Sequence, residues 1–539
     1  MTGNLVLKHH SLPKPAGEML SVAPLHIHVL LFASSATAAV AFSAAPTLPD
    51  RAPSWADLKA RTLSTPTGAR LAEEAELRST GLGPPHVNAK LRLFEPNSSE
   101  EDVRVVFYRD DSAWCPYSQR VWIALEEKRI SYICKTVPLN AYGIKPAWFT
   151  RLIDGGKLPA IEVDGTIVTE SMDIMRLLDE MFAGPNRVLF PDRGDPEQME
   201  RVESLLQLEQ KLQSDWFSLV FYPVEGGALA KARGDLLSTL KQVDDALGST
   251  PGPWFFGDDS EAPTITDIMF ISTMERVVAS CLYWKGLKIR DTGQYPNIDV
   301  WLMAFEERPT YRATKADIYN LIKAIPSQNG PGYFIDEAKG IASRICGLDG
   351  AWRLPLDYNK SFFEADITDE EAHRHEAAFV LTNKHEAIVV FAARGAGEAG
   401  RPSFQAELAD PYAEPNEDFI TPVDICLRHV TEALLSGGAD DPLSSGSVAF
   451  EDLAGQAGDG KLREYWGEYT DNDGEVYWWN DISGEAIYTP PTKQLDTCLA
   501  YLRDRIGVPR DLSPGAAAQL RAHLNWAIGL LNSNTGGRE

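Results

Sequence analysis

The stretch SAWCPYSQRVWIALEEK, residues 112–128, places a cysteine and a proline directly before a run whose apolar residues recur at helical spacing. The β-branched and aromatic segment VRVVFYR (103–109) precedes it, and SYICKTVPL (131–139) follows it. Both flanking segments have the composition of strands. The region therefore predicts a strand, a helix over 116–128 and a second strand, which is the βαβ unit of an α/β domain.

The next segment completes this domain. The sequence GGKLPAIEVDGTIVTESMDIMRLLDEMF (155–182) predicts two short strands joined by a turn at Asp164-Gly165, and a helix that begins near Ser171. The order βαβ, connecting helix and ββα is that of a thioredoxin-like domain, which we place at residues 101–190.

Cys115 occupies the position at which a helix presents unpaired backbone N–H groups and the positive end of its dipole. Both features favour a thiolate, so we expect the thiol pKa to lie below its usual value of about 8.5. Pro116 suits the first helical position because its missing N–H is not needed there. The fourth residue of the motif is Ser118, where a dithiol protein would have a second cysteine. The predicted chemistry of Cys115 is therefore a mixed disulfide that an external small thiol resolves.

Composition excludes several other classes of function. The chain has 539 residues, 44% hydrophobic content and a formal net charge of -26, so we expect two or three globular units and no nucleic-acid partner. After the N-terminus, no apolar run reaches the roughly 20 residues of a membrane span. The six cysteines are scattered without a zinc spacing. His373, His375 and His385 do not share one helical face, so we predict no metal site.

Several motifs in order make residues 103–325 resemble the cysteine-type glutathione transferases of the lambda and omega classes. The motif CPYSQRVWI is especially similar to that of the lambda class. The resemblance implies an α/β thioredoxin-like domain followed by an all-α glutathione-transferase C-terminal domain at 195–327. It also implies glutathione as co-substrate and Cys115 as catalytic nucleophile, and it leaves a homodimer open. In the helical domain, Thr264 and Asp267 stand at the spacing of a capping box, which serves folding.

The resemblance also implies a glutathione site. Lys145 matches the lysine that neutralises the glycine carboxylate, and Leu158-Pro159 match the hydrophobic residue and cis-proline whose backbone pairs with the cysteinyl part. Glu170 and Ser171 match the pair that grips the γ-glutamyl end. Each residue also has an ordinary structural interpretation: Leu158 as core, Lys145 as a solvated charge and Ser171 as an N-cap.

Beyond the resemblance, apolar spacing predicts a helical extension at 331–455 and a helical tail at 492–539 that packs with it. Between them, YWGEYTDNDGEVYWWNDISGEAIYTPP (465–491) predicts three short strands, and residues 461–491 resemble a WW domain. The resemblance makes Tyr477 and Tyr488 a groove for a proline-rich peptide. Tyr488 replaces the usual groove tryptophan and Asp481 the usual histidine, so a purely structural β-meander remains the alternative.

The N-terminal segment has the pattern of a targeting sequence. Residues 1–41 combine basic and apolar stretches with a small-residue cleavage pattern and are predicted to be a signal peptide. AVAFSAAP (39–46) resembles the bipartite plastid presequence of algae with secondary plastids, which makes 42–100 a transit-like or disordered segment. The predicted location is the plastid, and the alternative is secretion.

Two classes of function follow from these features. The first is a glutathione-dependent thiol transferase or reductase, which removes glutathione from disulfides or reduces dehydroascorbate. The alternative is a non-catalytic scaffold or ligand-binding protein with the transferase fold, whose WW-like segment docks a partner. Conjugation of glutathione to electrophiles is a weaker third option, because Cys115 would form a disulfide with glutathione.

Overall fold

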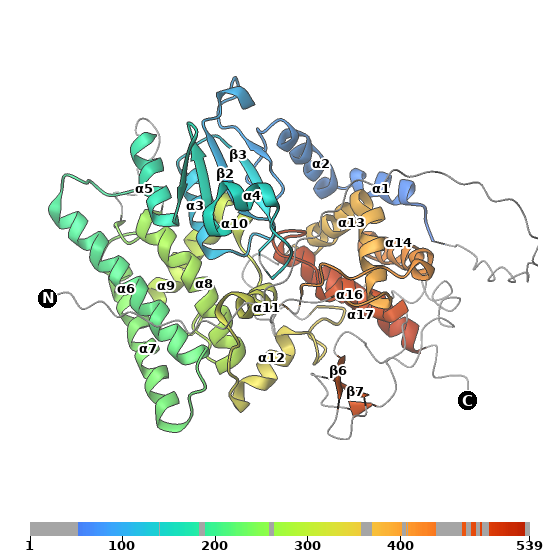
Figure 1. Cartoon of the computed structure of the whole chain (residues 1–539). Helices are drawn as coiled ribbons and strands as arrows, with labels where there is room; N and C mark the ends of the chain where they lie inside the picture. The colour runs from blue at the N-terminus through green and yellow to red at the C-terminus, as the bar shows by residue number, and fades with distance from the viewer. Residues whose placement is uncertain are drawn as a thin grey trace, which may run out of the picture. The chain divides into compact units, whose positions relative to one another are not determined.

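The computed structural model describes residues 52–139, 141–182, 189–257, 263–356, 369–400, 406, 408–437, 466–470, 476–480, 486–487 and 495–533. A five-stranded sheet in the order β1-β3-β2-β4-β5 forms the first domain (Figure 1). The strands are β1 (Leu91–Arg92), β2 (Val105–Asp110), β3 (Tyr132–Val137), β4 (Ala160–Val163) and β5 (Thr166–Thr169). Strand β2 pairs parallel with β3 and antiparallel with β4, which is the pairing of a thioredoxin-like sheet.

Helices cover both faces of this sheet. They are α3 (Pro116–Glu127), α4 (Ala147–Leu152) and α5 (Ser171–Met181). Because side chains alternate along a strand, Phe107 of β2 packs in the cluster that includes residues of α3 and α5, whereas Tyr108 packs with Phe149 of α4. The central strand β2 is thus buried on both faces just before it leads into the Cys115 loop.

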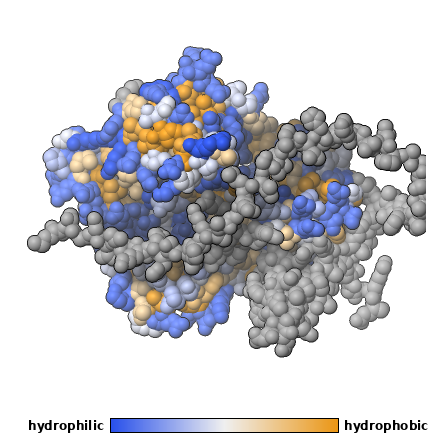
Figure 2. All heavy atoms as spheres, in the orientation of Figure 1, coloured by the Kyte–Doolittle hydropathy of each residue, from blue (hydrophilic) through white to orange (hydrophobic). Residues whose placement is uncertain are grey.

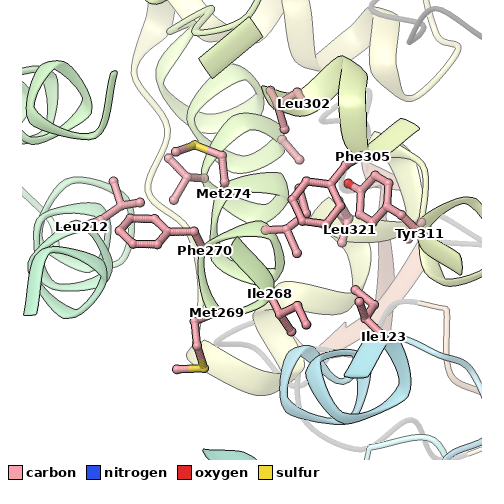
Figure 3. Close-up of a cluster of buried hydrophobic side chains, with 14 of the residues drawn as sticks. Ile123, Leu212, Ile268, Met269, Phe270, Met274, Leu302, Phe305, Tyr311 and Leu321 are labelled. Carbon is pink, nitrogen blue, oxygen red and sulfur yellow. The ribbon is translucent and has the colours of Figure 1, made fainter. Parts of the chain in front are cut away.

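A helical domain follows the sheet. It consists of α6 (Pro196–Val220), α7 (Gly226–Gly248), α8 (Ile265–Lys285), α9 (Pro296–Glu306), α10 (Pro309–Thr314) and α11 (Ile318–Asn329). Helix α8 is buried along nearly its whole length, and the predicted capping box of Thr264 and Asp267 is present at its start. Figure 3 shows apolar side chains of α8, including Phe270 and Met274, gathered with those of α6, α9, α10 and α11 and with Ile123 of α3. One core therefore joins the two domains.

Residues after the helical domain form a second core. The helices are α12 (Lys339–Ile345), α13 (Glu370–Ala392), α14 (Ile420–Ser436), α16 (Leu495–Asp504) and α17 (Pro514–Ser533). Leu381 of α13, Val430 of α14, Leu499 of α16 and Leu524 of α17 are buried in the same cluster. The helical tail thus packs with the preceding helices of the extension.

The segment before the sheet differs from the prediction. Residues 42–100 were expected to be transit-like or disordered, but α1 (Trp55–Ser64) and α2 (Pro66–Ser79) form within it. Ser54 and Thr65 cap these helices through their side chains. Ala52 and Trp55 pack against the second core, contacts with distant sequence that local composition could not show. For residues 52–100 the expectation is therefore wrong, whereas residues 1–51, with the signal peptide, lie outside the described residues.

Three further strands, β6 (Trp466–Thr470), β7 (Val476–Asn480) and β8 (Ala486–Ile487), form an antiparallel sheet in the order β6-β7-β8. Tyr477 lies in β7 opposite Tyr469, and Tyr488 and Asp481 lie outside the described residues. Among the described residues, none of the helices has the length and apolar character needed to cross a membrane.

Candidate active site

The strand register brings the predicted site residues to one edge of the sheet. Ala160 in β4 pairs with Tyr108 in β2 on one side and with Thr169 in β5 on the other. Residues that follow β2, precede β4 and follow β5 therefore lie at the same edge. This edge carries Cys115, Leu158, Pro159, Glu170 and Ser171.

Cys115 is the N-cap residue of α3, and Pro116 is the first residue of that helix. The cysteine is buried, with a relative exposure of 6%. Its Sγ lies 3.9 Å from the carbonyl oxygen of Leu158, and the Leu158–Pro159 peptide bond is cis, as the resemblance implies. The thiol therefore faces the backbone directly before β4.

The electrostatics of Cys115 correct one prediction. Burial raises the pKa of the Cys115 thiol, and the nearby Asp110 carboxylate raises it further. Hydrogen bonds from the side chain and backbone of Ser118 and from the backbone N–H of Tyr117 lower that pKa, but they are the smaller effect. The expectation of a thiol pKa below its usual value is therefore wrong. Burial takes the thiolate out of water, and this cost outweighs the stabilisation that the N-terminus of α3 gives to the thiolate. The sequence alone does not show how deeply the site is buried.

Lys145 lies in the loop between β3 and α4, and its Nζ donates a hydrogen bond to the carbonyl oxygen of Gly156. Partial burial lowers the pKa of the Lys145 ammonium, whereas the nearby Cys115 and Asp110 raise it. Lys145 is thus electrostatically coupled to the thiol and is not a fully solvated charge.

Glu170 and Ser171 form the N-terminus of α5. Glu170 has φ 65° and ψ 116°, a conformation that an L-residue adopts only at a cost. Ser171 is the first helical residue and is buried, and Glu170 precedes it as N-cap. The N-terminus of α5, whose first N–H groups have no partner within the helix, therefore lies next to β5 at this end of the sheet.

Buried polar residues that could not be found from the sequence motifs fix the loop before Cys115. The Asp110 carboxylate accepts the backbone N–H of Trp114 at 2.6 Å, and Arg276 Nη2 of α8 donates to the Trp114 carbonyl at 2.8 Å. Arg276 also pairs with Glu275 at 2.8 Å, and both are buried. A signal for these residues exists, because Glu275 and Arg276 interrupt an otherwise apolar helix and Asp110 ends a buried strand.

No group of three or more His, Cys, Asp or Glu side chains is placed to hold a metal ion in the described ranges.

Comparisons with known proteins agree with this arrangement. The family model for the glutathione S-transferase N-terminal domain matches residues 114–181, and the model for its C-terminal domain matches residues 226–303. The Arabidopsis thaliana protein glutathione S-transferase L3 is 30% identical over 216 residues, which cover 39% of this chain and 82% of that protein. The glutathione S-transferase L2, chloroplastic, of the same plant is 26% identical over 239 residues, which cover 43% of this chain and 75% of that protein.

A further relative matches over a shorter length. Arabidopsis thaliana glutathione S-transferase DHAR2 is 42% identical over 72 residues, which cover 13% of this chain and 32% of that protein. Both family models, the long match to the L3 protein and the sheet-edge cysteine lead to one conclusion: this chain belongs to the glutathione S-transferase family.

Proposed function

We propose that the protein is a glutathione-dependent thiol transferase that uses Cys115 as its nucleophile. The observation that carries this proposal is the placement of Cys115 Sγ at the N-terminus of α3, 3.9 Å from the Leu158 carbonyl oxygen. Ser118, at the position of a resolving cysteine, is buried and has no thiol. The adduct on Cys115 is therefore released by an external thiol.

The proposed reaction has two thiol–disulfide exchanges. In the first, the Cys115 thiolate attacks the glutathione sulfur of a mixed disulfide, a Cys115–glutathione disulfide forms, and the other thiol leaves with the electron pair of the broken S–S bond. In the second, a glutathione thiolate attacks the glutathione sulfur of the adduct, which forms glutathione disulfide and returns the Cys115 thiolate. The thiolate that leaves in the first exchange takes up one proton, the second glutathione gives one up, and Cys115 begins and ends the cycle as a thiolate.

Glutathione would bind along the sheet edge in this mechanism. Lys145 would pair with the glycine carboxylate after leaving the Gly156 carbonyl, and the backbone of Leu158 would pair with the cysteinyl residue. Glu170 and the N-terminus of α5 at Ser171 would hold the γ-glutamyl end. Cis-Pro159 would keep the Leu158 carbonyl directed toward the thiol.

Purified full-length protein with the mixed disulfide of glutathione and 2-mercaptoethanol tests the proposal. We expect turnover with added glutathione, and a Cys115→Ser variant should lose it. Cys134→Ser is the matched control, since Cys134 is equally buried but lies in β3. Equal turnover by wild type and Cys115→Ser would refute the mechanism, and binding of glutathione without turnover would favour the scaffold alternative.

The DHAR2 match supports dehydroascorbate as a second substrate of the same thiol. Two glutathione molecules would supply the two electrons, and the products would be ascorbate and glutathione disulfide. The rate of ascorbate formation, followed by its ultraviolet absorption, tests this activity with the same Cys115→Ser variant. Turnover of the mixed disulfide without ascorbate formation would limit the enzyme to disulfide substrates.

We also propose that residues 1–51 direct the protein to a plastid, and the relative named chloroplastic supports this location. A fluorescent fusion of these residues in an alga with secondary plastids tests it, with Phe42→Ala as the variant that should block import. Secretion of the unmutated fusion would contradict it.

For the WW-like segment we propose weak binding of proline-rich peptides, which the three antiparallel strands β6, β7 and β8 support. Titration of the full chain with a basic proline-rich peptide should give a dissociation constant in the micromolar to millimolar range typical of small exposed sites. This range corresponds to a binding free energy of roughly -4 to -8 kcal/mol. Tyr477→Ala should abolish it. Binding that survives this substitution would leave the segment a structural β-meander.

We further propose that two copies of the protein associate through their thioredoxin-like domains. Figure 2 shows apolar surface gathered over this domain, and the exposed apolar residues of α4 and the preceding loop are Ile144, Trp148 and Leu152. Exposed apolar patches of this kind mark interaction sites. Analytical ultracentrifugation of wild type and Trp148→Glu tests the dimer, and a monomeric wild type would refute it.

A further inference from the structure

The loop between α16 and α17 is anchored on α11 of the helical domain. Asn320 Nδ2 donates to the Ile506 carbonyl at 3.1 Å, and the backbone N–H of Val508 donates to Asn320 Oδ1 at 2.7 Å. Arg521 of α17 donates to the same Ile506 carbonyl at 3.0 Å and pairs with Asp317 at 2.6 Å. These contacts fix the backbone of 506–508, which lies beyond the segments that the family models match, against the start of α11.

The Val508 carbonyl accepts a hydrogen bond from the Trp114 indole Nε1 at 2.9 Å. Val508 is 0% exposed and Trp114 is 2% exposed, so neither group can exchange this partner for bulk water. A buried indole N–H without an acceptor would lose its full hydration energy. The contact therefore holds the indole in one orientation.

The Trp114 ring is also where two parts of the site meet. Trp114 directly precedes Cys115, and its ring packs edge-on against Tyr142 with 5.1 Å between centroids. Tyr142 belongs to the loop that carries Lys145. On the extension side, the Arg510 guanidinium carbon lies 5.7 Å from the Trp114 ring centroid. The indole thus contacts the nucleophile's loop, the lysine's loop and the extension at once.

We propose that the C-terminal extension is a part of the active site: its Val508, held by Asn320 of α11, holds Trp114 and thereby positions the Tyr142–Lys145 loop for glutathione. The inference rests on the proposed function, because it assigns Lys145 to glutathione binding. Trp114, Val508 and Asn320 are positioning residues and do not touch the reacting atoms. The backbone of Trp114 is held separately by Asp110 and Arg276, so release of the indole affects the Lys145 loop more than the nucleophile.

Two substitutions release the indole from opposite sides. Trp114→Phe removes the indole N–H, and Asn320→Leu removes the amide group that holds Val508 while keeping the same branching of the side chain. We expect each to raise KM for glutathione about fivefold, the effect of one hydrogen bond, with kcat within about twofold of wild type. The double variant should equal the larger single effect, because both substitutions break one connection.

Trp122→Phe is the matched control. Trp122 is a buried tryptophan of α3 whose Nε1 donates to Tyr132 at 2.8 Å, away from the extension. This variant should lose comparable thermal stability and keep the wild-type KM. An unchanged KM in both Trp114→Phe and Asn320→Leu, additive effects in the double variant, or the same KM rise in Trp122→Phe would each overturn the proposal.

A readout that needs no turnover separates this inference from the proposed function. Direct binding of glutathione to the Cys115→Ser protein, measured by calorimetry, should weaken by the same factor when Trp114→Phe or Asn320→Leu is added. If wild type has no thiol-transferase activity but binding weakens as expected, the proposed reaction fails and the positioning role stands. If turnover is present but binding is unaffected, the positioning role fails.

Discussion

The Asp110 carboxylate accepts the backbone N–H of Trp114 at 2.6 Å and lies close enough to Cys115 to raise the pKa of its thiol. Asp110 is 0% exposed, and burial raises its own pKa. The acid that shapes the loop before the nucleophile therefore also opposes formation of the thiolate. Lys145 is the opposite charge that faces both groups.

Asp110→Asn should lower the pKa of the Cys115 thiol, because it removes a negative charge and keeps an oxygen that can accept the Trp114 N–H. The thiolate fraction grows as pH rises through the thiol pKa, so a lower pKa makes alkylation by iodoacetamide faster at neutral pH. A fall of about one unit corresponds to a gain of about tenfold.

The measurement is the rate of Cys115 alkylation across pH, followed by peptide mass spectrometry. Asp111→Asn is the control, because Asp111 is exposed and should leave the midpoint unchanged. A midpoint in Asp110→Asn equal to that of wild type would show that Asp110 does not act on the thiol.

Ser118→Cys should convert the motif to a dithiol. Cys115 and Ser118 stand at the first turn of α3, and both are buried at its start. Mild oxidation should form an internal disulfide, which lowers the mass by two hydrogen atoms and protects Cys115 from alkylation. The combined variant with Cys115→Ser cannot form this bond and serves as control. An intact thiol after oxidation would mean that the first turn does not bring the two side chains together.

Asp267 is predicted to be among the most important polar residues for stability of the helical domain. Its carboxylate accepts the Thr264 N–H at 2.9 Å, the Trp301 indole N–H at 2.9 Å and the Phe255 N–H at 3.2 Å. Asp267→Ala would leave these buried donors unpaired and should reduce the free energy of unfolding by about 3 kcal/mol. Thr264→Ala should cost about 1 kcal/mol.

Urea denaturation followed by tryptophan fluorescence measures both losses. Asp267→Asn is the intermediate variant, because it preserves the shape and one acceptor oxygen. Equal stability of Asp267→Ala and wild type would contradict the role of the capping box in folding.

Local motifs explain which parts of the site could be predicted. Cys115 before Pro116 and the capping box at Thr264 each depend on residues within a few positions, whereas the cis bond before Pro159 was implied by the family resemblance. The structure contains all three features. The thiol pKa depends on burial by several distant segments, which the sequence does not show. The hydrogen bond from the Trp114 indole to the Val508 carbonyl joins positions 394 residues apart, and no local pattern indicates it.

The contacts of the N-terminal helix α1 with distant residues also could not be predicted from the sequence, and they lead to a prediction on where the N-terminal segment is cleaved. Trp55 Nε1 donates to Asp424 of α14 at 2.7 Å, and Arg428 Nη1 donates to the carbonyl oxygens of Ala52 and Pro53 at 3.2 and 3.3 Å. Helix α1 is therefore part of the second core and should remain in the mature protein. For the proposed plastid import, we expect cleavage to fall before Ala52.

Mass spectrometry of the N-terminus of the imported protein tests this expectation. Removal of residues 1–51 should leave the thermal midpoint unchanged, whereas removal through Ser64 should lower it, because the Trp55 side chain and its hydrogen bond are lost. Trp55→Phe, which loses the hydrogen bond and part of the ring, should cost about 1 to 2 kcal/mol. A mature chain that begins after Ser64, with the stability of the longer protein, would show that α1 is a dispensable part of the leader.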